Sequence, residues 1–340
     1  MQYPKPLLPG SRIAVTACSS GVPKPLHPRL NRVLDGLRDQ GFEVIEGQCL
    51  REDTQHVSAE KTRRAKELMD FLCDETIDAV IPPWGGERAI ELLELLDYNR
   101  LKQVKPKWIL GFSDTSTLMV ALTTRLGWST AHGANLMQLV PEESEPLTSN
   151  TLSYLGEPET FTQYASSHYQ IKQKDFAIHP AAGLNLTEPT SWKVLDGGEQ
   201  LQMKGRLIGG CLDTLIHTLG TKYFDLRQFH EQYRQDGLIL YLENAEQTPP
   251  ALYRALTGFK YKGVFDRVNG VLLGRNAVID SPDTEFTGLD AIQMTLGALP
   301  VPVIYDADIG HLPPNMTLLN GALCEISVKQ GRASMVQSLT

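Results

Sequence analysis

The sequence predicts a two-domain α/β protein whose N-terminal part is a parallel sheet with helices on both faces. Three observations support this class. The chain has 340 residues, more than a single hydrophobic core usually serves. Short apolar runs alternate with amphipathic stretches, as expected of βαβ units. The composition, 41% hydrophobic and 21% charged, is that of an ordinary globular protein.

The first 150 residues carry the clearest alternation. We expect strands at 11–18, 42–46, 79–81 and 108–112, and helices at 27–40, 59–73, 87–96 and about 114–125. The first helix ends at Gly41, a residue type common just after helices. This spacing predicts parallel strands joined by right-handed crossovers, and in such sheets the ligand crevice lies at the carboxyl ends of the strands.

The pattern weakens over residues 141–189, where Pro, Ser, Gln and His are scattered. We therefore place an N-terminal domain at 1–150, a linker and surface segment at 151–190 and a C-terminal domain at 191–340. The last of these is again α/β. Its expected strands are 237–242, 268–274 and 303–307, its expected helices are 212–219, 252–261 and 289–296, and residues 318–326 resemble a closing hairpin.

Charge and motif content argue against several classes of protein. A net charge of −8 disfavours general nucleic-acid binding, which needs a basic face. The N-terminus lacks the regions of a signal peptide and no run reaches the roughly 18 apolar residues of a membrane span, so we expect a cytoplasmic protein without a membrane partner. The five cysteines are scattered without a C-x-x-C pair, and the usual dinucleotide, P-loop and zincin motifs are missing. We therefore expect no metal and no cofactor.

The most informative stretch is 107–122, which predicts a buried strand that turns sharply at Ser113 into a helix beginning near Asp114. Such an elbow exposes the serine hydroxyl and places the next amide at a helix N-terminus, where negative charge is favoured. The alternative is that Ser113 or Asp114 simply caps the helix. The hydrolase pattern G-x-S-x-G is only partly met, because Thr115 stands at the second glycine position.

Two further ionisable residues follow predicted strands. Glu243 ends an apolar strand, and His311 lies between Gly310 and the pair Pro313-Pro314. With Ser113 they give the order Ser, Glu, His along the chain, in which His311 would accept the serine proton and Glu243 would orient the imidazole. A solvated glutamate and a surface histidine are the alternatives.

Motifs spread over nearly the whole chain resemble those of the LD-carboxypeptidase family of serine peptidases. They lie at 83–86, 111–117, 205–212 with 219–221, 240–243 and 309–311, in the order of that family. The resemblance implies Ser113 as nucleophile, Glu243 and His311 as its partners, and an oxyanion hole made by the amides of Gly86 and Asp114. It also implies a flavodoxin-like N-terminal domain, a smaller C-terminal α/β domain, an active site between them and commonly a homodimer.

The family has two main branches with different substrates. One removes D-alanine from murein tetrapeptides, and the other, the microcin C self-immunity branch, cleaves aminoacyl-nucleotide analogues. The chain length, Trp192 within 191–195 and Arg275 at a strand end look more like the second branch, which would make both residues substrate-binding. Packing and ion pairing are the alternative roles. Cys211 and Ala134 depart from the asparagine and proline usual in the family, so the resemblance does not predict the details of the pocket near these two positions.

A different class stays open beside the hydrolase. A two-domain α/β protein with a cleft could be a catalytically inactive small-molecule binding protein on the same fold. The joint presence of Ser113, Glu243 and His311 distinguishes the two, because a pure binder has no need of the set. The sequence leaves open whether residues 141–189 close over the site.

Overall fold

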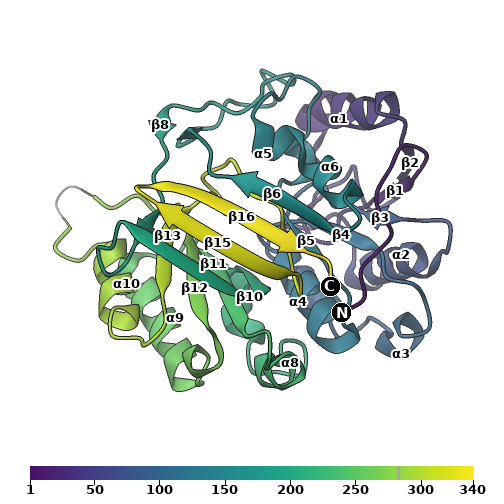
Figure 1. Cartoon of the computed structure of the whole chain (residues 1–340). Coiled ribbons are helices and arrows are strands. Elements are labelled where there is room, and N and C mark those ends of the chain that lie inside the picture. Colours follow the sequence, from purple (N-terminus) through teal and green to yellow (C-terminus); the bar gives the residue numbers. More distant parts are fainter. Residues whose placement is uncertain (282–283) are drawn as a thin grey trace.

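The computed structural model describes residues 1–281 and 284–340 and contains two large β-sheets flanked by helices (Figure 1). One sheet has six strands and the other eight, and a two-stranded ribbon is formed by β7 (His168–Tyr169) and β8 (Glu188–Pro189). The predicted α/β class is confirmed.

The six-stranded sheet is built mainly from the N-terminal part of the chain. Its order is β14-β5-β4-β3-β1-β2, and all neighbours from β2 to β5 are parallel. The order 2-1-3-4-5 is that of flavodoxin-like sheets. The strands are β1 (Arg12–Val15), β2 (Glu43–Glu46), β3 (Ala79–Val80), β4 (Trp108–Gly111), β5 (Ala131–His132) and β14 (Leu318–Leu319).

Successive strand residues point to opposite faces of this sheet, and helices cover both. Ile13 and Leu110 pack with α1 (His27–Asp39) on one face. Ala14 and Ile109 pack on the other face with the helices α2 (Lys61–Cys73), α3 (Tyr98–Leu101) and α4 (Thr115–Leu126). The near-continuous apolar runs of the strands follow from this double coverage.

The helix predicted at 87–96 is wrong, because this segment forms only the short 3-10 helix η2 (Ala89–Leu92). The amides of Arg88 and Ala89 bond to the side chains of Ser19 and Asp114, which fixes the start of the segment in a loop. Its leucines are nevertheless buried against α2 and α4. Their spacing therefore reflects burial on one side of a loop, which periodicity does not distinguish from a helix.

The eight-stranded sheet has the order β6-β16-β15-β10-β11-β12-β13-β9, with the central strands β10 to β13 parallel. Its strands are β6 (Thr160–Tyr164), β9 (Lys193–Val194), β10 (Gln200–Cys211), β11 (Leu238–Glu243), β12 (Gly270–Gly274), β13 (Val303–Ala307), β15 (Leu323–Lys329) and β16 (Arg332–Ser338). One face is covered by helices, namely α7 (Leu212–Thr218), α8 (Leu226–Gln232), α9 (Pro249–Tyr261) and α10 (Gly288–Leu296).

The chain crosses between the sheets near its end. The hairpin predicted over 318–326 is wrong, because β14 pairs with β5 of the six-stranded sheet while β15 forms a hairpin with β16. The segment 141–189 also contributes structure: the short helices α5 (Pro146–Ser149) and α6 (Thr151–Gly156), and then β6 at the edge of the eight-stranded sheet. The chain termini lie close together (Figure 1).

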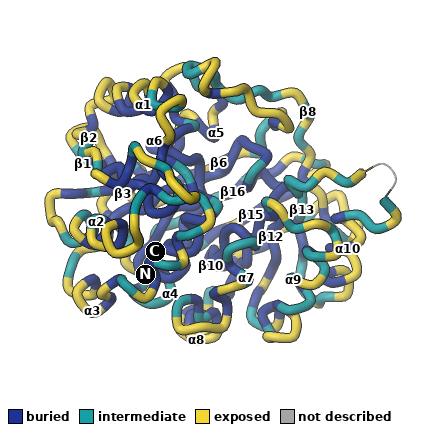
Figure 2. The backbone as a smooth tube through the Cα atoms, turned by 180° about the vertical axis from the view of Figure 1, so that it is seen from behind, coloured by how far each residue is buried: buried dark blue, intermediate teal, exposed yellow. Residues whose placement is uncertain are grey.

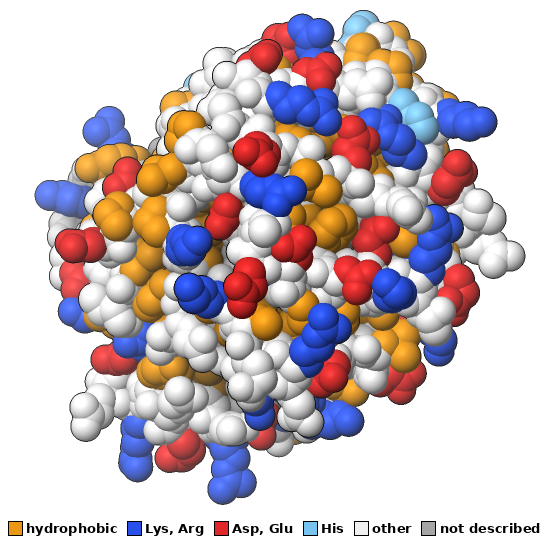
Figure 3. Space-filling view, turned by 90° about the vertical axis from the view of Figure 1, so that its right-hand side faces the viewer, with side chains coloured by type: hydrophobic (Ala, Val, Ile, Leu, Met, Phe, Trp, Pro, Cys, Tyr) orange, Lys and Arg blue, Asp and Glu red, His pale blue; other side chains and the backbone are white. Residues whose placement is uncertain are grey.

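The central strands of both sheets are buried, whereas the edge strand β2 and the strands β6, β15 and β16 are partly exposed, and the helices expose one side (Figure 2). On the face shown in Figure 3, acidic and basic side chains are interspersed. Among the described residues, no helix combines the length and apolarity that a membrane crossing requires.

Candidate active site

Ser113 lies at the carboxyl end of β4, in a backbone conformation that is unusual for serine. Its φ is +61°, in the left-handed region that non-glycine residues rarely adopt. The residue is held there from both sides, because Phe112 N donates to Asn135 Oδ1 and Ser116 N donates to Ser113 O. Strain of this kind is typical of a nucleophile elbow, in which the hydroxyl is directed out of the sheet.

The capping alternative does not describe this elbow. Asp114 is the residue at the N-cap of α4, but its side chain makes no capping hydrogen bond. The Ser113 hydroxyl is engaged instead by a histidine from a distant part of the chain. The turn therefore presents Ser113 for contacts outside its own helix.

The structure brings Ser113, His311 and Glu243 together. His311 Nε2 is 3.1 Å from Ser113 Oγ, and His311 Nδ1 is 2.8 Å from Glu243 Oε2. Glu243 is the last residue of β11 and is buried, whereas His311 follows β13 by four residues and is partly exposed. With Nδ1 protonated, the ring donates to Glu243 and accepts from the Ser113 hydroxyl, which is the arrangement of a serine–histidine–carboxylate relay.

The electrostatics of the pair favour a charged His311 next to a charged Glu243. Burial acts to lower the pKa of His311, but the charge and hydrogen bond of Glu243 outweigh it and the pKa is raised. Burial acts to raise the pKa of Glu243, and the charge and hydrogen bond of His311 reverse this, so its pKa is lowered. Glu243 therefore stabilises the imidazolium that forms when His311 accepts a proton.

Glycines let the chain pass close to these side chains. Gly310 has a φ of +103°, and a Cβ atom at this position would lie 2.6 Å from Glu243 Oε2. The end of β11 at Glu243 and the loop that carries His311 thus approach each other so closely that only glycine fits at position 310. Phe112 contacts the His311 ring edge-on, with centroids 5.0 Å apart.

The loop of Gly85 and Gly86 lies against the elbow. A Cβ atom on Gly85 would be 2.7 Å from the Asp114 amide nitrogen and 2.9 Å from Ser113 Oγ. Within the described parts of the chain, the amides of Gly86 and Asp114 donate no hydrogen bond to another protein group. Gly86 and Asp114 line the same cavity as Ser113, and two free N–H groups at such a site are the donors that an oxyanion requires.

The Asp114 carboxylate fixes this loop, a function that the sequence did not indicate. It accepts hydrogen bonds from Ser19 Oγ and from Ala89 N, each 2.7 Å away. Ser19 Oγ in turn accepts from Arg88 N. Burial raises the pKa of Asp114, partly offset by these hydrogen bonds. Residues 19, 88 and 114 are far apart in the sequence and form no motif, so this network could not have been predicted from the sequence.

Ser113 and His311 open into a cavity of about 280 Å³ between the two halves of the chain. Apart from the predicted residues, its walls come from η2 and the elbow, from α7, and from the loop after β11. These additional lining residues are Glu87, Ile90, Thr117, Cys211, Asp213, Thr214, His217, Ala245, Glu246 and Gln247. No sequence pattern pointed to them, because their position at the cavity depends on how the loops and α7 pack around Ser113.

Family models match both halves of the chain. The LD-carboxypeptidase N-terminal domain matches residues 13–133, and the LD-carboxypeptidase C-terminal domain matches residues 204–326. The chain belongs to the LD-carboxypeptidase family. The family is one of serine peptidases, so the protein is a hydrolase of that type. The two matched regions carry the Gly86 loop and Ser113 in the first, and Glu243 and His311 in the second.

Relatives extend over nearly the whole chain. A Streptomyces coelicolor protein named as a carboxypeptidase is 30% identical over 98% of this chain and 95% of its own length. A Vibrio cholerae protein with a similar name is 28% identical over 92% and 91%. A Bacillus subtilis protein named as a murein peptide carboxypeptidase is 24% identical over 97% and 93%.

A solved structure has the same fold. The structure of MccF in complex with glutamyl sulfamoyl guanosine has a TM-score of 0.84 over 98% of this chain and 97% of that one, at 22% identity. MccF is the microcin C7 self-immunity protein of Escherichia coli.

Trp192 and Arg275 do not line the cavity at Ser113. Trp192 is 1% exposed and its Nε1 donates to Asp308 Oδ2 at 2.9 Å, so its ring presents no open face to a ligand. Arg275 is buried, forms an ion pair with Asp308 and donates to the carbonyl of Leu312, next to His311. Both residues therefore contact the segment that carries His311.

The two departures from the family pattern lie at buried positions. Ala134 is buried in the N-terminal core. Cys211 lines the cavity, and its Sγ is 3.6 Å from Asp213 Oδ2. Burial raises the pKa of the Cys211 thiol well above its usual value, so this group is a neutral thiol.

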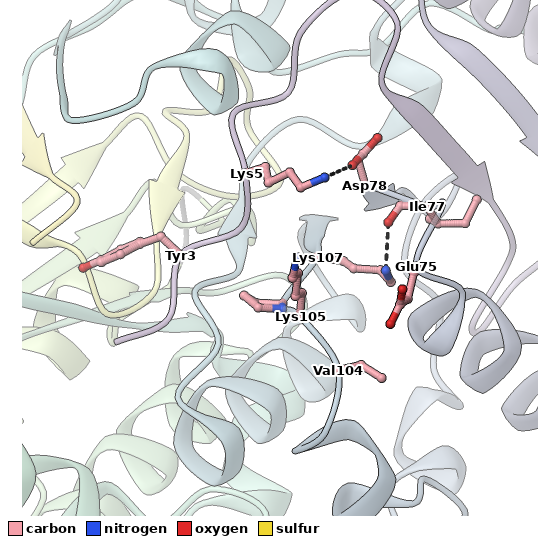
Figure 4. Close-up of a pocket in the computed structure, with 9 residues that line it drawn as sticks. Tyr3, Lys5, Glu75, Ile77, Asp78, Val104, Lys105 and Lys107 are labelled. Atoms are coloured by element: carbon pink, nitrogen blue, oxygen red, sulfur yellow. Dashed lines mark hydrogen bonds and ion pairs between the residues drawn. The ribbon is translucent and has the colours of Figure 1, made fainter.

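Another cavity, of about 160 Å³, lies at the amino ends of strands in the N-terminal sheet (Figure 4). Its walls include the residues just before β3 and β4, which are the amino ends of the strands. Lys107 donates to the carbonyl of Ile77, and Lys5 pairs with Asp78 at 3.8 Å. This cavity is separate from Ser113, which lies at the carboxyl end of β4.

Proposed function

We propose that the protein hydrolyses an amide bond with Ser113 as nucleophile, His311 as general base and acid, and Glu243 as the residue that orients and charges the imidazole. The substrate is a murein-derived LD-peptide or an aminoacyl-nucleotide of the microcin C type. The observation that carries this proposal is the continuous contact from Ser113 Oγ through His311 to Glu243, 3.1 and 2.8 Å long, at a strained elbow that opens into a cavity.

In the first half-reaction, Ser113 Oγ attacks the substrate carbonyl carbon while its proton passes to His311 Nε2. The carbonyl oxygen becomes an oxyanion, which the amides of Gly86 and Asp114 stabilise. Collapse of the tetrahedral intermediate breaks the C–N bond, and His311 gives its proton to the departing nitrogen. The acyl group is then an ester of Ser113.

In the second half-reaction, His311 takes a proton from water as the water oxygen attacks the ester. The second intermediate expels Ser113 Oγ, which regains the proton from His311. The products are a carboxylic acid and an amine, and the enzyme returns to its starting state. Glu243 keeps its negative charge throughout, so the imidazolium is stabilised in both halves.

The substrate class rests on the relatives alone. The Bacillus subtilis protein is named for murein peptides, and MccF was solved with an aminoacyl sulfamoyl nucleoside. The buried ring of Trp192 gives no stacking surface in this structure, so it offers no support for a nucleotide over a peptide. We propose that the cavity residues, and not Trp192 or Arg275, contact the substrate.

The experiment is to incubate the protein separately with a murein tetrapeptide and with an aminoacyl sulfamoyl adenosine, and to measure product masses. We expect release of D-alanine from the first or of the free amino acid from the second, and loss of that product with Ser113→Ala. Binding of either compound without any product, in wild type and variant alike, would indicate the inactive binding protein instead.

A further inference from the structure

The cavity beside Ser113 has an uneven distribution of charge. Its lining contains the acidic residues Glu87, Asp213 and Glu246, and neither lysine nor arginine. Asp114 also lines the cavity, but its carboxylate is buried and accepts from Ser19 and Ala89. The remaining ionisable groups of the cavity are the two histidines His217 and His311 and the neutral thiol of Cys211. A ligand in this space therefore faces several negative charges and no permanent positive one.

The nearby arginines do not neutralise these carboxylates. Arg88, next to Glu87 in sequence, pairs with Glu91 through its guanidinium, and Arg64 pairs with the same Glu91. Within the described residues, no ion pair joins Glu87, Asp213 or Glu246 to a lysine or arginine. Their charges remain available to a ligand.

Asp213 is held rigidly by neutral donors. Its carboxylate accepts hydrogen bonds from Ala245 N at 2.9 Å, Glu246 N at 3.0 Å and Gln247 Nε2 at 3.1 Å. Asn244 closes the same loop, since its Oδ1 accepts from Gln247 N and its Nδ2 donates to Gln247 O. These contacts fix a negative charge at the cavity wall before any ligand arrives.

The charges act close to the reacting atoms. Asp213 and Glu246, together with Glu243, contribute to raising the pKa of His311, so both lie within electrostatic reach of its ring. The side chain of Glu246 is exposed and carries no hydrogen bond of the loop, which leaves it free to turn toward a ligand.

On these observations, and resting on the proposed function, we propose that the cavity selects substrates whose acyl part carries an ammonium group, bound by Asp213 and Glu246. Opposite charges in a partly enclosed site attract, whereas an acidic acyl group would add a like charge to those already present. The ammonium is either that of a basic side chain or the free α-amino group.

The test uses two substrate series, L-Xaa-D-Ala peptides and the matching aminoacyl sulfamoyl adenosines, with lysyl, norleucyl or glutamyl as the acyl part. Each compound is measured with its α-amino group free and acetylated. We expect kcat/KM to fall roughly tenfold or more from lysyl to glutamyl, from free to acetylated α-amine, or in both comparisons. The norleucyl compound separates the loss of a positive charge from the gain of a negative one.

Variants assign the effect to the cavity. Glu246→Gln should reduce the preference severalfold and Glu246→Lys should reverse it, because this exposed side chain changes charge without breaking the loop. Asp213→Asn should reduce it further. Glu231→Gln removes the same charge from α8, outside the cavity, and should leave the preference unchanged.

Equal rates for lysyl and glutamyl compounds, with no effect of acetylation, would overturn the proposal, as would a preference that Glu246→Lys does not alter. A fluorophosphonate that labels Ser113 separates the two levels of the argument. Labelling of Ser113 without a charge preference would contradict only the specificity proposal. If Ser113 is not labelled and neither substrate series is turned over, the proposed function is wrong and this proposal with it.

Discussion

The ring of His311 lies between the Ser113 hydroxyl and the Glu243 carboxylate, so its protonation controls the proposed reaction. His311 must be neutral to accept the serine proton, and its pKa is raised above the usual value. Activity should therefore increase with pH through a limb that lies above pH 6.5.

Glu243→Gln tests the cause of that limb. The substitution removes the charge and the hydrogen bond that raise the pKa of His311, while burial still lowers it, so the limb should move to lower pH. We also expect kcat/KM to fall roughly 10³- to 10⁴-fold, because the imidazolium loses its partner. The measurement is kcat/KM from pH 5 to 9 for both proteins, and an unmoved limb would mean that Glu243 does not set the pKa of His311.

His132 gives a second prediction at the scale of single residues. Its ring is fully buried beside Tyr241 and Phe112, neither ring nitrogen has a partner among the described residues, and burial lowers its pKa to about 4. The unfolded chain binds this proton near pH 6.5 and the folded chain does not. The contribution of His132 to the free energy of unfolding is therefore fully present above pH 6.5 and is lost as the pH falls toward 4.

The decline amounts to as much as about 3 kcal/mol for this group, at about 1.4 kcal/mol per pKa unit. His132→Phe keeps an aromatic ring without the titration, so its stability should fall less steeply over the same range. Urea unfolding at several pH values provides the comparison. Parallel slopes for the two proteins would show that His132 is protonated in the folded state as readily as in the unfolded one.

Whether the role of a single residue could be predicted depended on how much of that role is visible in the neighbouring sequence. Ser113, Glu243 and His311 were identifiable because each follows a strand and carries a distinctive side chain. Ser19 and Asp213 were not, because their function depends on which loops the fold brings next to them. The buried position of the Trp192 ring could not be predicted from a sequence pattern.

Among the elements, the loop between β13 and β14 determines where His311 lies. Gly310 in this loop has a φ of +103° and no room for a Cβ atom beside Glu243. Gly220 has a φ of +86°, and a Cβ atom there would meet nothing within 4 Å. An alanine at either position would be strained by the left-handed backbone, but only at Gly310 would its Cβ atom also clash.

Gly310→Ala should therefore lower kcat/KM by roughly a hundredfold or more, since displacement of about 1 Å in a catalytic group has an effect of that size. Gly220→Ala should leave kcat/KM nearly unchanged and reduce stability by about 1 kcal/mol, the cost of a left-handed alanine. Kinetics and thermal unfolding of both variants check this. Similar activity in the two would contradict the proposed contact between the loop and Glu243.

Asp308 is the first residue of the same loop, and its fully buried side chain anchors the loop to the surrounding structure. Its carboxylate accepts from Trp192 Nε1 at 2.9 Å and Ser166 N at 3.0 Å and pairs with Arg275. Arg275→Met leaves this charge without its cation and should destabilise the protein by roughly 3 kcal/mol.

Trp192→Phe removes one of the hydrogen bonds to Asp308, at a cost of roughly 1 to 3 kcal/mol. Denaturant unfolding measures both changes, and KM for peptide and nucleotide substrates should respond equally. A rise in KM for the nucleotide alone would instead support the stacking role expected from the resemblance. The existence of β1 to β4 was predictable from alternation, whereas β14 was not, because a two-residue strand leaves no periodic pattern.

At the scale of the whole molecule, the two halves meet at α4, the helix of the elbow. It contacts β10 and α7 of the C-terminal half, and Ser116 Oγ accepts from Cys211 N at 3.1 Å. The nucleophile thus comes from one sheet and its partners from the other. The fold class could be predicted because it depends on local alternation, but the meeting of the halves depends on long-range packing that no local pattern encodes.

The central claim is that Ser113 becomes acylated. The most direct measurement is the intact mass of the protein after reaction with a fluorophosphonate, followed by peptide mapping. We expect one adduct per chain on Ser113, no adduct on Ser113→Ala, and slower labelling below the pKa of His311. An adduct on another residue, or equal labelling of Ser113→Ala, would contradict the account.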